Sequence, residues 1–126
     1  MAKIIIIDDD PDIVEATRLV LESKGHQVVS AGNVPEALKA VEKESPDLII
    51  LDVMMDEPDD GFYLANKFRK IGVDQPIIML TSVAKVTGFD FGKNDMMPID
   101  EFLEKPVASE KLLKAVNSLL EKSKGE

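Results

Sequence analysis

Five short apolar runs, separated by helix-like stretches, constrain the fold more than any other feature of this sequence. The first run, Ile4–Ile7, is β-branched throughout, which is typical of a strand covered on both faces of a parallel sheet. The other predicted strands are Val28–Ser30, Leu48–Leu51, Ile77–Leu80 and the weaker Glu101–Glu104. Strands that alternate with helices predict an α/β fold with a parallel sheet and helices on both faces.

Helix-start signals follow the first two predicted strands. Asp10 before Pro11 is typical of an N-cap with proline at the first helical position. Asn33 and Glu36 have the spacing of a capping box. From about Ser109, leucine and valine recur at helical spacing and predict a long amphipathic last helix.

Size and composition indicate one soluble domain. The chain has 126 residues, 44% of them hydrophobic, a mean hydropathy of −0.03 and no cysteine. We find no signal sequence and no apolar run long enough to span a membrane, so we expect a cytoplasmic protein that does not bind membranes. The net charge of −9, from 24 acidic and 15 basic residues, argues against direct nucleic acid binding.

Polar residues of a particular kind stand at the ends of four predicted strands. Asp8–Asp10 follow the first, Asp52 the third, Thr81 the fourth and Lys105 the fifth. Because ligands of open parallel sheets bind outside the carboxyl ends of the strands, we expect these groups to converge. An oxygen-only set without cysteine suits a hard cation, most simply Mg²⁺ with Mn²⁺ as an alternative. The single histidine, His26, is expected on the surface and has no role in this set.

The order and spacing of these residues resemble the receiver domain of response regulators, over the whole chain. The matching features are Asp8 and Asp9, Asp52, Thr81, and the dipeptide Lys105-Pro106. The resemblance implies a flavodoxin-like (βα)5 fold, a doubly wound five-stranded parallel sheet with strand order 2-1-3-4-5. We expect residues 1–121 to form the receiver domain and residues 122–126 a polar C-terminal tail.

The resemblance also implies how the site is used. Asp52 is expected to be the phosphoacceptor. Asp9 would bind Mg²⁺ directly, Asp8 would help partly through water, and Asp52 and the backbone carbonyl of Met54 would complete the protein's share of the metal shell. The chain would then be a switch that catalyses only its own phosphotransfer and slow autodephosphorylation, and not an enzyme acting on other substrates.

Further expectations from the resemblance concern the phosphorylated state and its partners. Thr81 and Lys105 would bind phosphoryl oxygens, and Phe102 matches the aromatic residue that changes rotamer on activation, although an ordinary strand aromatic explains it nearly as well. The phosphoryl donor would be a sensor histidine kinase or a phosphotransfer protein of a phosphorelay. The downstream target would be another protein.

The chain departs from the family's pattern in two segments. Gly61 lies one residue later than expected after Asp52, and the intervening loop, residues 56–60, is acidic. Residues 83–98 contain Gly88, Gly92 and Pro98 and show no clean helical period. We therefore expect a short or distorted helix, or a loop that becomes ordered on phosphorylation or partner binding, over residues 83–98.

Other classes of protein fit the sequence less well. A small phosphatase of the haloacid dehalogenase type would use Asp8 and Asp10, but it needs an acidic pair after Lys105 that Pro106–Ser109 does not supply. A flavin-binding module would need a Ser/Thr/Gly-rich phosphate loop after the first strand, and none is present. A receiver-like binding module that is never phosphorylated is disfavoured because every expected site residue is present.

Overall fold

The computed structural model describes residues 2–52, 60–81, 99–104 and 108–124. The strands are β1 (Lys3–Ile7), β2 (Gln27–Ala31), β3 (Leu48–Asp52), β4 (Ile77–Thr81) and β5 (Glu101–Glu104). The helices within these ranges are α1 (Pro11–Glu22), α2 (Val34–Glu44), α3 (Asp60–Lys70) and α5 (Ser109–Lys124). Each predicted strand is therefore present, to within a residue or so at its ends.

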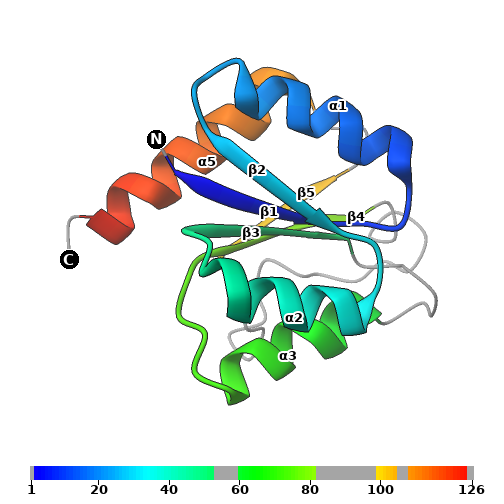
Figure 1. Cartoon of the computed structure of the whole chain (residues 1–126). Helices are drawn as coiled ribbons and strands as arrows, with labels where there is room; N and C mark the ends of the chain where they lie inside the picture. The colour runs from blue at the N-terminus through cyan, green and yellow to red at the C-terminus, as the bar shows by residue number, and fades with distance from the viewer. Residues whose placement is uncertain (1, 53–59, 82–98, 105–107, 125–126) are drawn as a thin grey trace.

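The strands form one parallel sheet in the order β2-β1-β3-β4-β5 (Figure 1). β1 pairs with β2 on one side and with β3 on the other, and Ile7 lies opposite Leu51 in the second pairing. Chain connectivity reverses direction across the sheet between β1 and β3, which makes their carboxyl ends the topological switch point. The expected α/β class with a parallel sheet is confirmed.

Helices cover the sheet on both faces, with α1 and α5 on one side and α2 and α3 on the other (Figure 1). The two faces of β1 explain why its last four residues, Ile4–Ile7, are all apolar. Ile5 and Ile7 belong to a core shared with α2 and α3, whereas Ile4 and Ile6 belong to a core shared with α1 and α5. Because neighbouring side chains on a strand point to opposite faces, the interior of a central strand between two covered faces favours apolar side chains at every position.

The helix starts follow the predicted capping signals. The Asp10 carboxylate accepts a hydrogen bond from the Asp12 N–H at 2.9 Å, and Pro11 is the first residue of α1. At α2, the Asn33 side chain accepts from the Glu36 N–H at 2.9 Å. The Glu36 carboxylate in turn accepts from the Gly32 N–H at 3.1 Å, one residue earlier than in the usual capping box.

The structure contradicts one expectation about local structure and does not describe the residues of another. α5 continues to Lys124, so the helix extends into residues 122–126, which were expected to be a tail. The expectation for residues 83–98 falls outside the described residues.

Within the described part of the chain, no helix combines the length and apolar character needed to cross a membrane.

Candidate functional site: an acidic cluster at the carboxyl edge of the sheet

Two central strands bring the site carboxylates together. β1 ends at Ile7 and is followed by Asp8 and Asp9, while Asp52 is the last residue of β3. Since Ile7 lies opposite Leu51 in a parallel pairing, the next residue of each strand, Asp8 and Asp52, comes side by side at the same edge. The predicted convergence of these carboxylates is confirmed.

The carboxylates of Asp8, Asp9 and Asp52 are close enough to hold one ion. One oxygen atom from each lies within 4.8 Å of the others. Asp8 and Asp52 are buried, with 4% and 6% of their surface exposed, whereas Asp9 is exposed. The cluster is thus buried on the protein side and open to solvent through Asp9.

Three negative charges at this spacing repel one another. Like charges this close raise the free energy of the ionised cluster, and the effect is strongest where the carboxylates are buried. A divalent cation would offset this repulsion, and carboxylate oxygens are the ligands that Mg²⁺ and Ca²⁺ take in proteins. Two or three carboxylates, with remaining positions left to water and a phosphate, fit Mg²⁺ in particular. The donor set therefore fits the cation expected from the sequence.

Asp10 lies next to the cluster in sequence, but its side chain caps a helix and is not part of the cluster. Its carboxylate caps α1, and its N–H donates to the Asp8 carboxylate at 2.9 Å. Among the described residues, the group able to hold a metal contains Asp8, Asp9 and Asp52 and does not include Asp10. This arrangement disagrees with a phosphatase site built on Asp8 and Asp10.

The other expected site residues are described only in part. Thr81 is the last residue of β4, where its Cα lies opposite Glu104 of β5, and Phe102 lies opposite Met79. The backbone of Thr81 is therefore at the carboxyl edge, as predicted. The side chains of Thr81 and Phe102 lie outside the described part of the chain, as do Met54 and Lys105 altogether.

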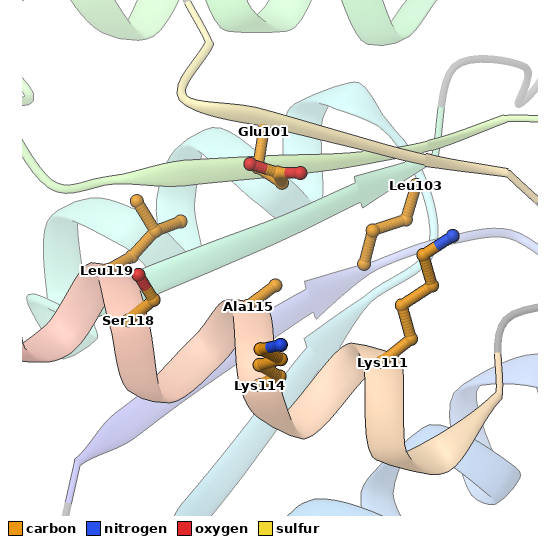
Figure 2. A pocket seen from close by; sticks show the side chains of 7 residues that line it. All are labelled: Glu101, Leu103, Lys111, Lys114, Ala115, Ser118 and Leu119. Carbon is orange, nitrogen blue, oxygen red and sulfur yellow. The ribbon is translucent and has the colours of Figure 1, made fainter.

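A groove elsewhere on the surface was not foreseen from the sequence. It lies between β5 and α5 and has a volume of about 280 Å³ (Figure 2). Its lining includes apolar and charged side chains: Leu103, Ala115, Leu119, Glu101, Lys111 and Lys114. With two ammonium groups and one carboxylate, this groove does not suit a divalent cation, so the aspartate cluster remains the candidate site. No motif marks the groove, because its shape depends on how α5 packs against β5 and not on a local residue pattern.

Comparison with known proteins agrees with this geometry. The family model of the response regulator receiver domain matches residues 4–117. The response regulator MprA of Mycobacterium leprae (strain TN) is 37% identical over 126 residues, which cover 97% of this chain and 52% of that protein. The chain thus spans about half the length of the curated relatives it matches.

Solved structures show the same fold. The CheY-like receiver domain protein of Methanospirillum hungatei JF-1 has a TM-score of 0.84 and 26% identity, over 99% of this chain and 98% of that one. The BeF3-activated N-terminal receiver domain of Klebsiella pneumoniae RstA has a TM-score of 0.77 and 26% identity, over 94% and 97% of the two chains. Sequence family, fold and acidic cluster lead to one conclusion: this chain belongs to the response regulator receiver domain family of two-component systems.

Proposed function

We propose that this chain is a phosphorylation-controlled signalling switch that accepts a phosphoryl group on Asp52 in the presence of Mg²⁺. The observation that carries the proposal is the grouping of Asp8, Asp9 and Asp52 within 4.8 Å at the switch point of a receiver fold. Asp52 is the member of this group that ends a central strand, where it is buried and lies opposite Leu80 of β4. Its carboxylate is held by the sheet and not by a loop, which favours a fixed angle of attack.

The metal would be held by oxygen atoms of four residues. Asp8, Asp9 and Asp52 supply carboxylates, and the backbone carbonyl of Met54 is proposed as the fourth. When bound, Mg²⁺ neutralises charge on the phosphoryl oxygens and on the attacking carboxylate. The Asp10 N–H holds one Asp8 oxygen at 2.9 Å and so orients that carboxylate toward the cluster.

The proposed reaction is a transfer between two protein side chains. A carboxylate oxygen of Asp52 attacks the phosphorus of a phosphohistidine in line, the P–N bond breaks, and the electron pair returns to the imidazole nitrogen. Lys105 would pair with a phosphoryl oxygen and offset the developing charge, while Thr81 would donate a hydrogen bond to another. Water later hydrolyses the acyl phosphate and restores the Asp52 carboxylate.

The switch itself would act through these same groups. The phosphoryl group adds charge and acceptor oxygens, which would draw Thr81 inward and leave space for Phe102 to change rotamer. We assign residues 1–121 to this receiver domain, and the last residues of α5 extend past this boundary to Lys124. The phosphodonor partner would be a histidine kinase or a phosphotransfer protein, and the target another protein, because a net charge of −9 disfavours direct contact with nucleic acid.

Covalent labelling tests the proposal. The parent protein, incubated with Mg²⁺ and acetyl phosphate, should gain one phosphoryl group by intact mass, and Asp52→Asn should gain none because an amide cannot form the acyl phosphate. Asp74→Asn, at an exposed carboxylate in the loop between α3 and β4, is the matched control and should label like the parent. Label that persists in Asp52→Asn would contradict the proposal.

The same experiment separates the phosphatase alternative. A phosphatase using Asp8 and Asp10 would keep its label in Asp52→Asn and lose it in Asp8→Asn or Asp10→Asn. The family match and the capping function of Asp10 give this alternative no support.

A further inference from the structure

A network of polar contacts joins three elements at the edge of the sheet opposite the aspartate cluster. Arg69 lies in the last turn of α3. Its Nη1 atom donates to the carbonyl oxygens of Val73 at 2.9 Å and Gln75 at 2.8 Å, both in the loop between α3 and β4. Its Nη2 atom donates to the Asp100 carboxylate at 3.1 Å. One guanidinium therefore ties the end of α3 to the entrances of β4 and β5.

Asp100 fixes the start of β5 against the start of β4 from both sides. The Asp100 Oδ2 atom accepts from the Ile77 N–H at 2.8 Å, and the Asp100 N–H donates to the Ile77 carbonyl oxygen at 2.9 Å. Arg69 and Ile77 share the same carboxylate oxygen, so loss of Arg69 would leave that carboxylate free to turn away from β4.

The contacts of Arg69 and Asp100, which we call the lock, matter because β5 is short and lies at the edge of the sheet. β5 comprises only Glu101–Glu104 and pairs with β4 alone within the described part of the chain. In the observed register, Ile78 lies opposite Glu101 at one end and Thr81 opposite Glu104 at the other. A slip of one residue would move the end of β5 by about 3.3 Å and would exchange its two faces.

We propose that Arg69 and Asp100 are positioning residues for phosphoryl transfer, because they hold the register in which Thr81 lies opposite Glu104, the residue before Lys105. The inference rests on the proposed function, in which Thr81 and Lys105 bind the phosphoryl group. Lys105 follows Glu104 directly in the sequence, so any shift of β5 is passed to it. The carboxylates proposed to bind the metal lie at the ends of β1 and β3, and none of these bonds reaches either strand. The proposal therefore predicts that phosphoryl binding depends on the contacts of Arg69 and Asp100, and that metal binding does not.

The test measures the two properties separately. Mg²⁺ binding is followed by calorimetry, and beryllofluoride, a phosphoryl mimic, is then titrated at saturating Mg²⁺. Arg69→Gln and Asp100→Ala should bind Mg²⁺ within about twofold of the parent and lose roughly tenfold or more in beryllofluoride affinity, since a misplacement of about 1 Å in a site can cost on the order of 100-fold. Asp100→Asn should recover part of the loss, because its amide oxygen can still accept from the Ile77 N–H.

The chain contains a matched control at the same edge of the sheet. Lys3 and Glu44 form an ion pair of 3.0 Å whose side chains are 28% and 29% exposed, close to the 3.1 Å, 28% and 39% of Arg69 and Asp100. The control pair joins β1 to α2 and does not contact β5. Glu44→Gln should therefore leave both affinities unchanged.

Three results would overturn the inference. The first is parental beryllofluoride affinity in folded Arg69→Gln, the second an equal loss in Glu44→Gln, and the third a parallel loss of Mg²⁺ affinity. If Asp100→Ala fails to fold by circular dichroism, Arg69→Gln and Asp100→Asn decide the question. If the parent itself binds Mg²⁺ but no beryllofluoride, the proposed function fails and the inference falls with it, which is distinct from failure of the lock alone.

Discussion

At the residue scale, the run Asp8–Asp10 shows three identical side chains in three different environments. Asp8 is buried and accepts from the Asp10 N–H, Asp9 is exposed beside it, and Asp10 caps α1. The chain leaves the sheet and begins a helix within these residues, so each side chain points in a different direction. Proline at the next position fixes where the helix begins and hence which aspartate becomes the cap.

Substitutions at Asp9 and Asp10 should therefore change different properties, Mg²⁺ affinity at Asp9 and stability at Asp10. Asp10→Asn should retain both Mg²⁺ affinity and stability, since asparagine caps as well as aspartate, whereas Asp10→Ala should lower the free energy of unfolding by about 1 kcal/mol. Asp9→Asn should weaken Mg²⁺ binding and leave stability unchanged or increased, because one of the repelling charges is removed. Urea denaturation and calorimetry measure the two quantities. A loss of Mg²⁺ affinity in Asp10→Asn would contradict this division.

The environment of His26 predicts that the stability of the fold depends on pH. The sequence suggested a surface position, but the imidazole is half-buried, and its Nδ1 atom accepts from the Ala2 N–H at 3.3 Å. Burial lowers the pKa of His26 below its ordinary value of 6.5. The folded state thus holds the proton less tightly than the unfolded state, so stability is complete above about pH 6.5 and declines as the pH falls through the lowered pKa.

The expected outcome is a lower urea midpoint at about pH 5.5 than at about pH 7.5, with a smaller difference in His26→Gln. Glutamine offers a side-chain oxygen that can accept from the Ala2 N–H without titrating. An identical decline in parent and variant would assign the pH dependence to other groups.

At the scale of single elements, the end of α2 is strained in a way that the end of α1 is not. Ser45 adopts φ 46° and ψ 61°, the left-handed conformation that is costly for a residue with a Cβ atom. Ser23 follows α1 in an ordinary right-handed conformation, with φ −63°, and its hydroxyl donates to the Val20 carbonyl oxygen at 2.6 Å.

Glycine should therefore have opposite effects at these two positions. Ser45→Gly should raise the free energy of unfolding by about 0.5–1 kcal/mol, because relief of left-handed strain exceeds the added entropy of the unfolded chain. Ser23→Gly should lower it by a similar amount. Thermal or urea denaturation of the two variants provides the comparison, and stabilisation of both would contradict the explanation.

How well each element could be predicted depends on how local its determinants are. The start of α1 at Pro11 and the cap at Asn33 follow from side-chain and backbone bonds within a few residues, so the sequence predicted them. The contact between Arg69 and Asp100 at the start of β5 joins residues more than 30 positions apart, and neither residue stands out in sequence. The end of α5 was placed too early because polar residues after Leu120 were taken as a tail, although exposed helix positions are polar too.

At the scale of the whole molecule, the sheet separates two cores. The first contains alternate residues of β1, β3 and β4 with α2 and α3, and the second contains the remaining residues with α1, β5 and α5. Ile7 belongs to the first core and Ile78 to the second, and both are fully buried. β3 lies between their strands.

The two cores should behave as energetically independent. Ile7→Val and Ile78→Val should each cost about 0.5–1.5 kcal/mol, and the double variant should equal their sum within about 0.5 kcal/mol. Denaturant unfolding of the four proteins in this cycle measures the coupling. A coupling free energy above about 1 kcal/mol would mean that the sheet transmits packing changes from one face to the other.

The candidate site was predictable at the same scale for a topological reason. In a parallel sheet with this strand order, the ends of β1 and β3 must meet, so Asp8, Asp9 and Asp52 converge without any long-range side-chain contact. The β5–α5 groove has no such rule behind it, because its shape depends on how α5 sits against an edge strand.

The outward growth of the sheet from β1 and β3 also sets an order in time. A chain synthesised from its N-terminus produces β1, β2 and β3, and with them all three clustered aspartates, before β4 has been made. β4 and then β5 add in chain order to the free side of β3. A nascent chain would thus complete its cation-binding half early, and the half proposed to grip the phosphoryl group would be the last part of the site to mature.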